Sequence, residues 1–378
     1  MNALRHLLCV VGARPNFIKI APIMAALRES SIRAELIHTG QHYDVAMNDT
    51  FFQQLEIPAP DVSLGVGSGS HAQQTAEVMK GFDAVLDRSA ADGVLVVGDV
   101  NSTIACALVA AKRDVRVIHV EAGLRSGDRR MPEEVNRVLT DQISDLLFTT
   151  ERSALDNLRR EGIDERRVHF VGNVMIDTLF RCRKRAVPPR ESLGKAGYEG
   201  ALERIEKEGY VLLTLHRPSN VDDPETLRGL LSAIGELSER IPFVFPVHPR
   251  TRSRIEALGL GALLASSRIF ALPPLGYLET LGLMQQARWV MTDSGGLQEE
   301  TTALQVPCLT LREHTERPIT VTEGSNRIVG VAPAAVVRAA TDLLEAKAFP
   351  GRVPELWDGQ SAKRIVAVLE NPQSFLPF

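Results

Sequence analysis

Short apolar runs bounded by Gly, Pro or Asp alternate along this chain with longer segments of helical periodicity. In the first half, the apolar runs predict strands at 6–11, 34–38, 94–97, 116–120, 145–149 and 167–171. Segments such as 17–29 and 102–112 are predicted to be helices between them. Continuous apolar strands separated by helices are typical of a parallel sheet with crossover helices. The first half is therefore predicted to be a doubly wound α/β domain.

The alternation stops at 181–209, a charged segment with Pro and Gly that contains no strand candidate. It begins again with strands predicted at 210–215, 243–247, 268–272, 288–292 and 307–311. We predict an α/β protein of two Rossmann-like, doubly wound parallel-sheet domains that face a cleft. The N-terminal domain is placed at residues 1–172, joined by a C-terminal helix within 360–378, and the C-terminal domain at 173–359.

Composition narrows the class of partner. The 378 residues include 43 Lys and Arg and 47 Asp and Glu. A net charge of -4 gives no indication of binding to nucleic acid or to a membrane surface. Apolar runs fall short of the 18 residues that a membrane span needs. The cysteines are far apart, without CxxC or metal-ligand spacing, and are interpreted as core thiols of a cytoplasmic protein: Cys9, Cys106, Cys182 and Cys308. No metal site is predicted.

Ligands of open α/β sheets bind beyond the carboxyl ends of the strands, so residues after each strand are candidates. The first predicted strand is followed by GARPNFIK, 12–19, where Arg14 and Lys19 flank a helix start at Pro15. Two cations beside a helix N-terminus favour an anion. The second strand is followed by Gln41 and His42.

Acidic residues follow the next two strands. Asp99 lies in a strand-to-helix turn, where it is either a helix cap or a catalytic group. Glu121 ends the following strand, and Glu133 and Glu134 begin a helix after Pro132, where the helix dipole alone favours them. Because Asp99 and Glu121 belong to neighbouring strand ends, we expect them to face one crevice.

The second half supplies complementary groups. His216 and Arg217 follow its first strand and His248 the next. A later strand is followed by the start of a helix, whose free backbone amides can bind a phosphate. Glu300, inside that helix, can accept hydrogen bonds from both hydroxyls of a ribose. This loop is neither GxGxxG nor a P-loop, which favours a nucleotide diphosphate over a dinucleotide cofactor. Its residues are Ser294, Gly295 and Gly296.

Taken together, these segments resemble the signature of the non-hydrolysing UDP-N-acetylglucosamine 2-epimerases. They are GARPNFIK, TGQHYD, GDVNST, HVEAGLRSGD with PEEVNR, TLHRPSN, PVHPR, TDSGGLQEE and TERP, in order between about residues 6 and 330. The resemblance implies a GT-B-like fold, with UDP bound by the C-terminal domain, and interconversion of UDP-GlcNAc and UDP-ManNAc without a cofactor. It also implies a cytoplasmic homodimer whose product serves surface polysaccharide synthesis.

The family's reaction is anti elimination of UDP to 2-acetamidoglucal, followed by re-addition with a proton delivered to the opposite face. Proton transfer is assigned by this resemblance to Asp99, Glu121 and Glu133, without deciding which is the base. Arg14, His216 and the 294–296 loop are expected to stabilise the departing diphosphate. The resemblance makes Lys19 a supporting residue. The remaining substrate contacts are expected from Gln41, His42, Asn136, Arg137, Arg217, His248, Glu300 and Arg317.

Some positions depart from the family pattern. Pro218 and Ser219 follow the His216-Arg217 pair, where members activated by their own substrate commonly have Arg and Glu, and Asn16 and Ile319 replace frequent glutamates. Substrate activation is therefore not expected. Alternative activities are C2 epimerisation of a UDP-2,3-diacetamido uronic acid, glycosyl transfer on the same fold, hydrolytic epimerisation and non-catalytic nucleotide-sugar sensing. Three acidic residues in the first domain favour epimerisation over transfer.

Overall fold

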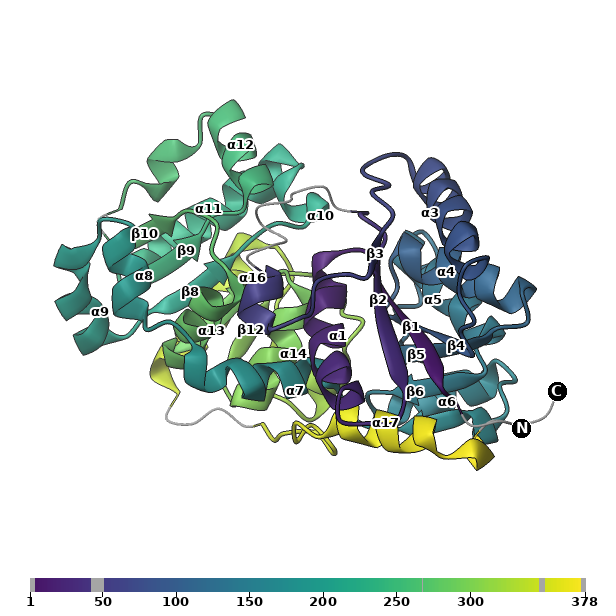
Figure 1. The fold of residues 1–378 in the computed structure, drawn as a ribbon. Coiled ribbons are helices and arrows are strands. Elements are labelled where there is room, and N and C mark those ends of the chain that lie inside the picture. Colours follow the sequence, from purple (N-terminus) through teal and green to yellow (C-terminus); the bar gives the residue numbers. More distant parts are fainter. Residues whose placement is uncertain (1–3, 42–50, 267, 347–350, 375–378) are drawn as a thin grey trace. The chain divides into compact units, whose positions relative to one another are not determined.

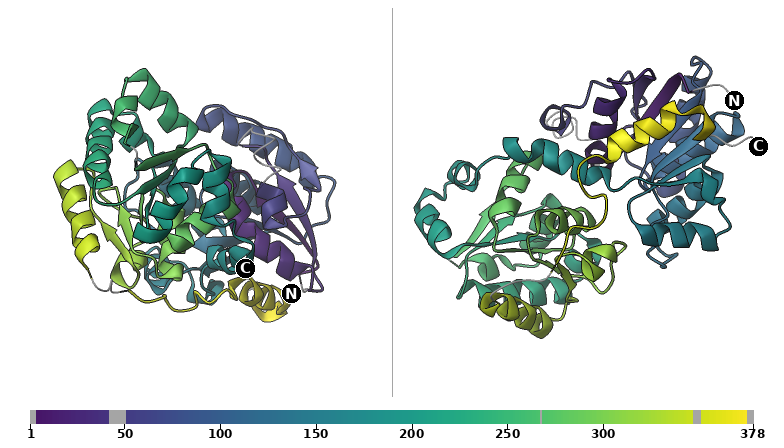
Figure 2. Two further views of the ribbon diagram at one scale, coloured as in Figure 1. Left: turned by 90° about the vertical axis from the view of Figure 1, so that its left-hand side faces the viewer. Right: turned by 90° about the horizontal axis from the view of Figure 1, so that it is seen from below.

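The computed structural model describes residues 4–41, 51–266, 268–346 and 351–374. The chain divides into two compact units, each an α/β layer structure (Figures 1 and 2). Unit 1 comprises Met1–Arg181 and Glu355–Phe378, and unit 2 comprises Cys182–Pro354. The sequence placed these junctions at 172/173 and 359/360.

Unit 1 is built on a seven-stranded parallel sheet, counted over the described residues, in the order β3-β2-β1-β4-β5-β6-β7. The chain moves outward from β1 in one direction and from β4 in the other, so the topological switch lies between these two strands. The predicted parallel sheet is confirmed. The strands are β1 (His6–Val11), β2 (Arg33–His38), β3 (Val62–Ser63), β4 (Gly93–Val97), β5 (Arg116–Ala122), β6 (Leu146–Thr149) and β7 (Val168–Phe170).

Helices cover both faces of this sheet, with α1 and α17 on one side and α3 and α4 on the other (Figure 1). The C-terminal helix α17 packs against α1, as Figure 2 also shows. The α-helices described from end to end are α1 (Arg14–Leu27), α3 (His71–Leu86), α4 (Asn101–Lys112), α5 (Pro132–Ile143), α6 (Arg152–Arg160), α7 (Val174–Cys182) and α17 (Ser361–Glu370). Short 3-10 turns occupy Glu165–Arg167 and Pro372–Ser374.

The C-terminal segment is held to unit 1 by polar contacts. Asp177 on α7 accepts hydrogen bonds from the amides of Ser361 and Ala362, at 3.1 and 2.7 Å, and so caps the start of α17. The indole of Trp357 donates to the carbonyl of Thr150 at 3.0 Å. Burial raises the pKa of Asp177, which the two amide donors partly offset.

Unit 2 contains a second all-parallel sheet, with six strands among the described residues, in the order β10-β9-β8-β11-β12-β13. Its switch lies between β8 and β11, so the loops that follow these two strands lie side by side. The strands are β8 (Val211–Thr214), β9 (Phe243–Pro246), β10 (Ile269–Leu272), β11 (Trp289–Thr292), β12 (Cys308–Thr310) and β13 (Asn326–Ile328).

The helices of unit 2 cover its sheet, with α11 packed against α16. Its α-helices, in the described part of the chain, are α8 (Pro189–Lys195), α9 (Leu202–Glu208), α10 (Pro218–Val221), α11 (Pro224–Ser238), α12 (Pro249–Ala257), α13 (Tyr277–Gln286), α14 (Gly295–Leu304), α15 (Ile319–Thr322) and α16 (Pro333–Glu345). Further 3-10 turns are Arg183–Arg185, Glu199–Ala201 and Gly261–Leu264. None of the helices that the structure describes is both long and apolar enough to span a bilayer.

Two edge strands were not predicted. β3 is two residues long and β13 three, and only one residue of the latter, Asn326, is buried. Each of these strands contains a single apolar residue, too few to produce an apolar run. The prediction of no strand at 181–209 is confirmed, because short helices and turns occupy this segment.

Candidate active site

A buried ion pair joins the ends of two elements in unit 1. The Lys19 ammonium on α1 lies 2.7 Å from Oε1 of Glu121 on β5, and the two side chains are 5% and 1% exposed. Gly98 at the end of β4 has φ +67°, and a Cβ there would approach Nζ of Lys19 to 2.8 Å. A glycine is therefore needed where β4 passes this ion pair.

Glu121 has an unusual backbone for a non-glycine residue. Its φ is +72°, in the left-handed region, and the β5–β6 register shifts between Val120 and Ala122. Glu121 is thus the extra residue of a bulge, a feature that redirects a side chain at the end of a strand. Such backbone conformations cost on the order of 1–3 kcal/mol and occur preferentially at functional sites.

Asp99 follows β4 and pairs with Arg137. The N-cap residue of α4 is Val100, and the Asp99 carboxylate forms an ion pair with the Arg137 guanidinium. Arg137 is itself buried and donates from Nη1 to Oε2 of Glu134 at 2.9 Å. Asn136 donates from Nδ2 to the backbone carbonyl of Asp99 at 2.9 Å. The structure therefore brings together Asp99, Asn136 and Arg137, which the sequence had named separately.

Glu134 takes part in this cluster, and the sequence did not select it. Its oxygens accept hydrogen bonds from the amides of Ser126 and Gly127, both at 2.9 Å. Burial raises the pKa of Glu134, but these donors and the charge of Arg137 outweigh burial and hold the pKa below its ordinary value. Its position three residues before Arg137, on one helix face, was the available signal.

Glu133, predicted to transfer protons, occupies the first turn of α5 and is partly exposed. Within the described residues, no hydrogen bond or ion pair fixes its side chain. The structure thus places the two neighbouring glutamates differently. Glu134 is buried and hydrogen-bonded, whereas Glu133 on the same helix is partly exposed to solvent.

The other predicted residues of unit 1 have local contacts. The guanidinium of Arg14 lies over the ring of Phe51, 5.5 Å from its centroid. Gln41 accepts at Oε1 from the amide and hydroxyl of Ser102, at 3.2 and 2.8 Å. Gln41 therefore ties the end of β2 to α4. His42 lies outside the described residues.

Asn16 has a structural role at the start of α1. Its Oδ1 accepts from the amides of Gly12 and Ala13, at 3.0 and 3.1 Å, and its Nδ2 donates to the carbonyl of Val97 at 3.0 Å. These contacts need a donor and an acceptor on one side chain, which an ionised glutamate does not offer. The departure from the family pattern at this position is thus accommodated by the fold.

In unit 2, Asp293 supports His216. Asp293 is fully buried and accepts from the amides of His216 and Arg217, each at 2.9 Å, while Nδ1 of His216 lies 2.9 Å from its Oδ1. Burial raises the pKa of Asp293, but the hydrogen bond from His216 outweighs it and holds the pKa low. The sequence did not identify Asp293. Its place at the strand end directly before Ser294 was the available signal.

The predicted phosphate loop is the N-terminus of α14. Ser294 is the N-cap residue, its side chain forms no capping hydrogen bond, and α14 begins with Gly295 and Gly296. A Cβ at Gly295 would lie 3.9 Å from Nη2 of Arg217. Helix amides and a guanidinium therefore meet at one point, which suits a phosphate group.

Glu300 lies one turn further along α14 and is buried. Its Oε1 accepts from the hydroxyl of Tyr277 at 2.7 Å. Burial raises the pKa of Glu300 to about 7, and the neighbouring Glu299 contributes in the same direction. Tyr277 is a second residue that the sequence did not indicate.

Two predicted unit 2 residues have clear partners. The Nδ1 of His248 accepts from the amide of Arg250 at 3.2 Å and so caps α12, although its ring still lies 5.7 Å from that of His216. Arg317 is buried and lies 3.1 Å from the carboxylate of Glu299.

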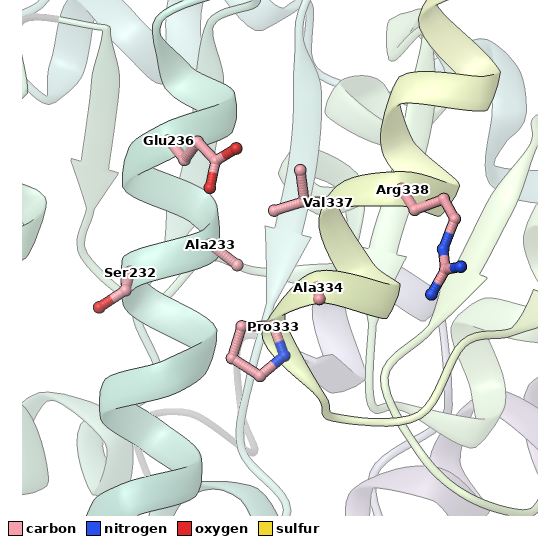
Figure 3. Close-up of a pocket in the computed structure, with 7 residues that line it drawn as sticks. All are labelled: Ser232, Ala233, Glu236, Pro333, Ala334, Val337 and Arg338. Carbon is pink, nitrogen blue, oxygen red and sulfur yellow. The ribbon is translucent and has the colours of Figure 1, made fainter.

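Two hollows lie among the helices. One, of about 440 Å³, is lined by residues of the packed helices α11 and α16, including Ala233 and Val337 (Figure 3). It belongs to a helical face rather than to the strand-end loops. The other, of about 520 Å³, is bordered by α3, α4 and α5 and includes Asn101 and Asn136. Asn136 donates a hydrogen bond to the backbone carbonyl of Asp99, so this second hollow adjoins the Asp99–Arg137 ion pair.

Comparison with known proteins identifies the class. A family model described as UDP-N-acetylglucosamine 2-epimerase matches residues 25–370. The UDP-N-acetylglucosamine 2-epimerase of Methanocaldococcus jannaschii is 41% identical over 363 residues, 95% of this chain and 97% of that protein. A crystal structure of the enzyme from that organism, in complex with UDP-GlcNAc and UDP, covers 96% of this chain and 99% of its own with a TM-score of 0.83 at 40% identity.

A relative with a different substrate is equally similar. The UDP-2,3-diacetamido-2,3-dideoxy-D-glucuronate 2-epimerase of Pseudomonas aeruginosa is 41% identical over 367 residues, 96% of this chain and 99% of that protein. Both relatives are 2-epimerases of UDP-sugars, so sequence similarity indicates the type of reaction but does not distinguish between the two sugar substrates.

Proposed function

We propose that this chain, which belongs to the UDP-N-acetylglucosamine 2-epimerase family, interconverts UDP-GlcNAc and UDP-ManNAc by inverting C2 of the sugar. It is an isomerase by its family. The observation that carries the proposal is the position of Asp99 and Glu121 at the carboxyl ends of the neighbouring parallel strands β4 and β5, each paired with a cationic partner. An acidic pair in fixed positions suits proton removal and return at one carbon.

The chemistry explains why two kinds of group are needed. The C2 proton has no adjacent carbonyl and is very weakly acidic. When the bond from C1 to the UDP oxygen breaks, C1 gains positive character and the C2 proton becomes removable. A carboxylate takes that proton, UDP leaves with the bonding electrons, and a C1–C2 double bond forms. Re-addition of UDP at C1 with protonation of the opposite face of C2 completes the inversion.

We assign proton transfer to Asp99, Glu121 and Glu133. The ion pairs of Asp99 and Glu121 support their roles by fixing the carboxylates, and the exposure of Glu133 leaves it able to meet a substrate. Lys19 and Arg137 are the partners that hold the first two.

We assign UDP binding to unit 2. The amides that begin α14 and the guanidinium of Arg217 support a diphosphate site. We assign His216, whose ring contacts Asp293, to stabilisation of the leaving group. Glu300 is assigned to the ribose hydroxyls. In unit 1, Arg14 is the further cation assigned to the departing diphosphate.

The test is the proton NMR spectrum of UDP-GlcNAc incubated with the enzyme in D2O. We expect UDP-ManNAc signals and deuterium at C2 of both sugars, because elimination and re-addition exchange that proton with solvent. Unchanged UDP-GlcNAc, or release of free ManNAc with UDP, would contradict the proposal. Transfer to an added acceptor without any epimer would instead indicate a glycosyltransferase.

The second candidate substrate is a UDP-2,3-diacetamido uronic acid, which the equal similarity of the Pseudomonas aeruginosa enzyme favours. The two sugars differ at C3 and C6, so the same incubation with each distinguishes them. A kcat/KM at least about 100-fold higher for one sugar identifies it as the substrate.

We also propose a cytoplasmic homodimer whose product supplies polysaccharide synthesis, as the family resemblance implies. The four cysteines support a reducing compartment, because all are buried and free. Sedimentation of the purified protein tests the dimer.

A further inference from the structure

His119 is fully buried in β5, two residues before Glu121, and its imidazole meets an acceptor at each nitrogen. Nδ1 lies 2.7 Å from Oδ1 of Asp141 on α5. Nε2 lies 2.8 Å from the backbone carbonyl of Gly98, the residue before Asp99. One side chain therefore joins β5, the end of β4 and the helix that carries Arg137.

The partners define the protonation of the ring. A carbonyl oxygen can only accept, so Nε2 must carry a hydrogen. The other oxygen of Asp141 accepts from the amide of Gly123 at 3.1 Å and lies 2.7 Å from Nη2 of Arg125, an arrangement that stabilises an ionised carboxylate. An ionised carboxylate also only accepts, so Nδ1 must carry a hydrogen too. Two N–H groups make the ring an imidazolium.

The surrounding charges balance this buried cation. Arg125 donates to both oxygens of Glu161, at 2.8 and 2.5 Å, as well as approaching Asp141. His119 and Arg125 are thus matched by two carboxylates. A buried ion is tolerated when it is paired and its hydrogen-bonding groups are satisfied.

Both strand ends that His119 joins have a backbone in the left-handed region. Gly98 has φ +67° and Glu121 has φ +72°. Glycine adopts this region without steric cost, whereas the conformation of Glu121 persists only where surrounding contacts impose it. His119 supplies one of these contacts directly, through the carbonyl of Gly98, and Asp141 supplies another, through the amide of Gly123.

We infer that His119 is a buried imidazolium that sets the positions of Asp99 and Glu121, acting as a positioning residue for proton transfer at C2. The inference rests on the proposed function for its catalytic consequence, but its structural part does not. A neutral ring has one donor and leaves either the Gly98 carbonyl or the Asp141 carboxylate facing a lone pair. The spacing of the two carboxylates then loses one of its constraints.

The first test is the nitrogen NMR spectrum of the wild-type protein labelled with 15N-histidine, with His119→Gln used for assignment. We expect both ring nitrogens of His119 to show the chemical shift and proton coupling of N–H groups near neutral pH. A ring nitrogen with the shift of a lone-pair nitrogen overturns the inference. This result is independent of any enzymatic activity.

The second test separates positioning from folding. His119→Asn retains a donor towards Asp141, His119→Gln retains one towards Gly98, and His119→Phe retains neither. We expect kcat for C2 exchange to fall about 100-fold in His119→Phe and less in the other two, with UDP affinity unchanged, because small displacements of reacting groups have effects of this size. The matched control is His169→Gln, a half-buried histidine of β7, with unchanged kcat.

The outcomes are distinguishable. If the wild-type enzyme does not exchange C2, the proposed function fails and the nitrogen spectrum alone decides the state of His119. If the wild-type enzyme exchanges C2 and folded His119→Phe retains its kcat, the positioning role is overturned. If His119→Phe does not fold, the Asn and Gln variants decide, and wild-type kcat in both overturns the role.

Discussion

The Nζ of Lys19 lies 2.7 Å from Oε1 of Glu121, and neither side chain is more than 5% exposed. The two residues are 102 positions apart in the sequence. Removing water from two charges is costly, so such a pair contributes most visibly when one partner is lost. The remaining charge then stays buried without this partner.

Lys19→Met is expected to lower the free energy of unfolding of unit 1 by about 3–5 kcal/mol, because it leaves the Glu121 carboxylate buried without its cation. The measurement is urea unfolding followed by a probe in unit 1. The double variant with Glu121→Gln should recover part of the loss, since no buried charge is then uncompensated. Equal stabilities of the single and double variants would contradict the assigned partnership.

Asp99→Asn and Glu121→Gln are each expected to lower kcat by about 100- to 10,000-fold while UDP still binds, because a carboxamide does not accept the C2 proton. Deuterium incorporation at C2 measures turnover, and calorimetric titration with UDP measures binding. Rates near that of the wild-type enzyme in both variants would refute the assignment. Loss of UDP binding in step with turnover would point instead to a folding defect.

Glu133 and Glu134 provide a matched pair on one helix. Glu133→Gln is expected to lower turnover with little change in stability, because the side chain is partly exposed and no described residue fixes it. Glu134→Gln is expected to lower stability by about 1–3 kcal/mol, because it weakens the hydrogen bonds that hold the amides of Ser126 and Gly127. Thermal unfolding and turnover of both variants check this contrast, and the reverse pattern would exchange their roles.

Glu300 predicts a pH dependence of stability. Its pKa in the folded chain is about 7, against an ordinary 4.5, so between these values the folded chain holds a proton that the unfolded chain has released. The free energy of unfolding should therefore fall, on the order of 3 kcal/mol, as the pH rises through this window. Glu300→Gln should remove this contribution while keeping an acceptor for Tyr277.

The comparison is urea unfolding of the wild-type protein and Glu300→Gln at pH 5 and pH 8. Taking the difference between the two proteins cancels titration of other groups, including Glu316, whose pKa burial raises but Arg312 and neighbouring cations hold at about 2. Parallel pH dependences in both proteins would show that Glu300 does not titrate in this range.

The segment after His216 predicts a reaction that does not need activation by UDP-GlcNAc. Pro218 begins α10 and Arg217 is its N-cap residue, so the positions where activated relatives carry Arg and Glu form a short helix here. The reverse reaction from UDP-ManNAc should therefore start without added UDP-GlcNAc. The progress curve from the first seconds measures this, and a lag abolished by trace UDP-GlcNAc would contradict it.

The sequence by itself determined the class of fold and the places to look. Most strands contain an apolar run that local pattern identifies, and all eleven predicted strands lie within two residues of the observed ones at each end. Strands β3 and β13 were missed because each contains a single apolar residue, which does not produce such a run.

The tertiary structure decided which side chains meet. Asp293, Tyr277 and His119 act through partners that lie near them only after the strands take their order in the sheet. Local periodicity contains no information on whether β4 pairs with β5 or on which oxygen faces which donor. Sequence pattern records burial, which is a property of single positions, whereas positioning is a property of pairs brought together across the sheet by folding.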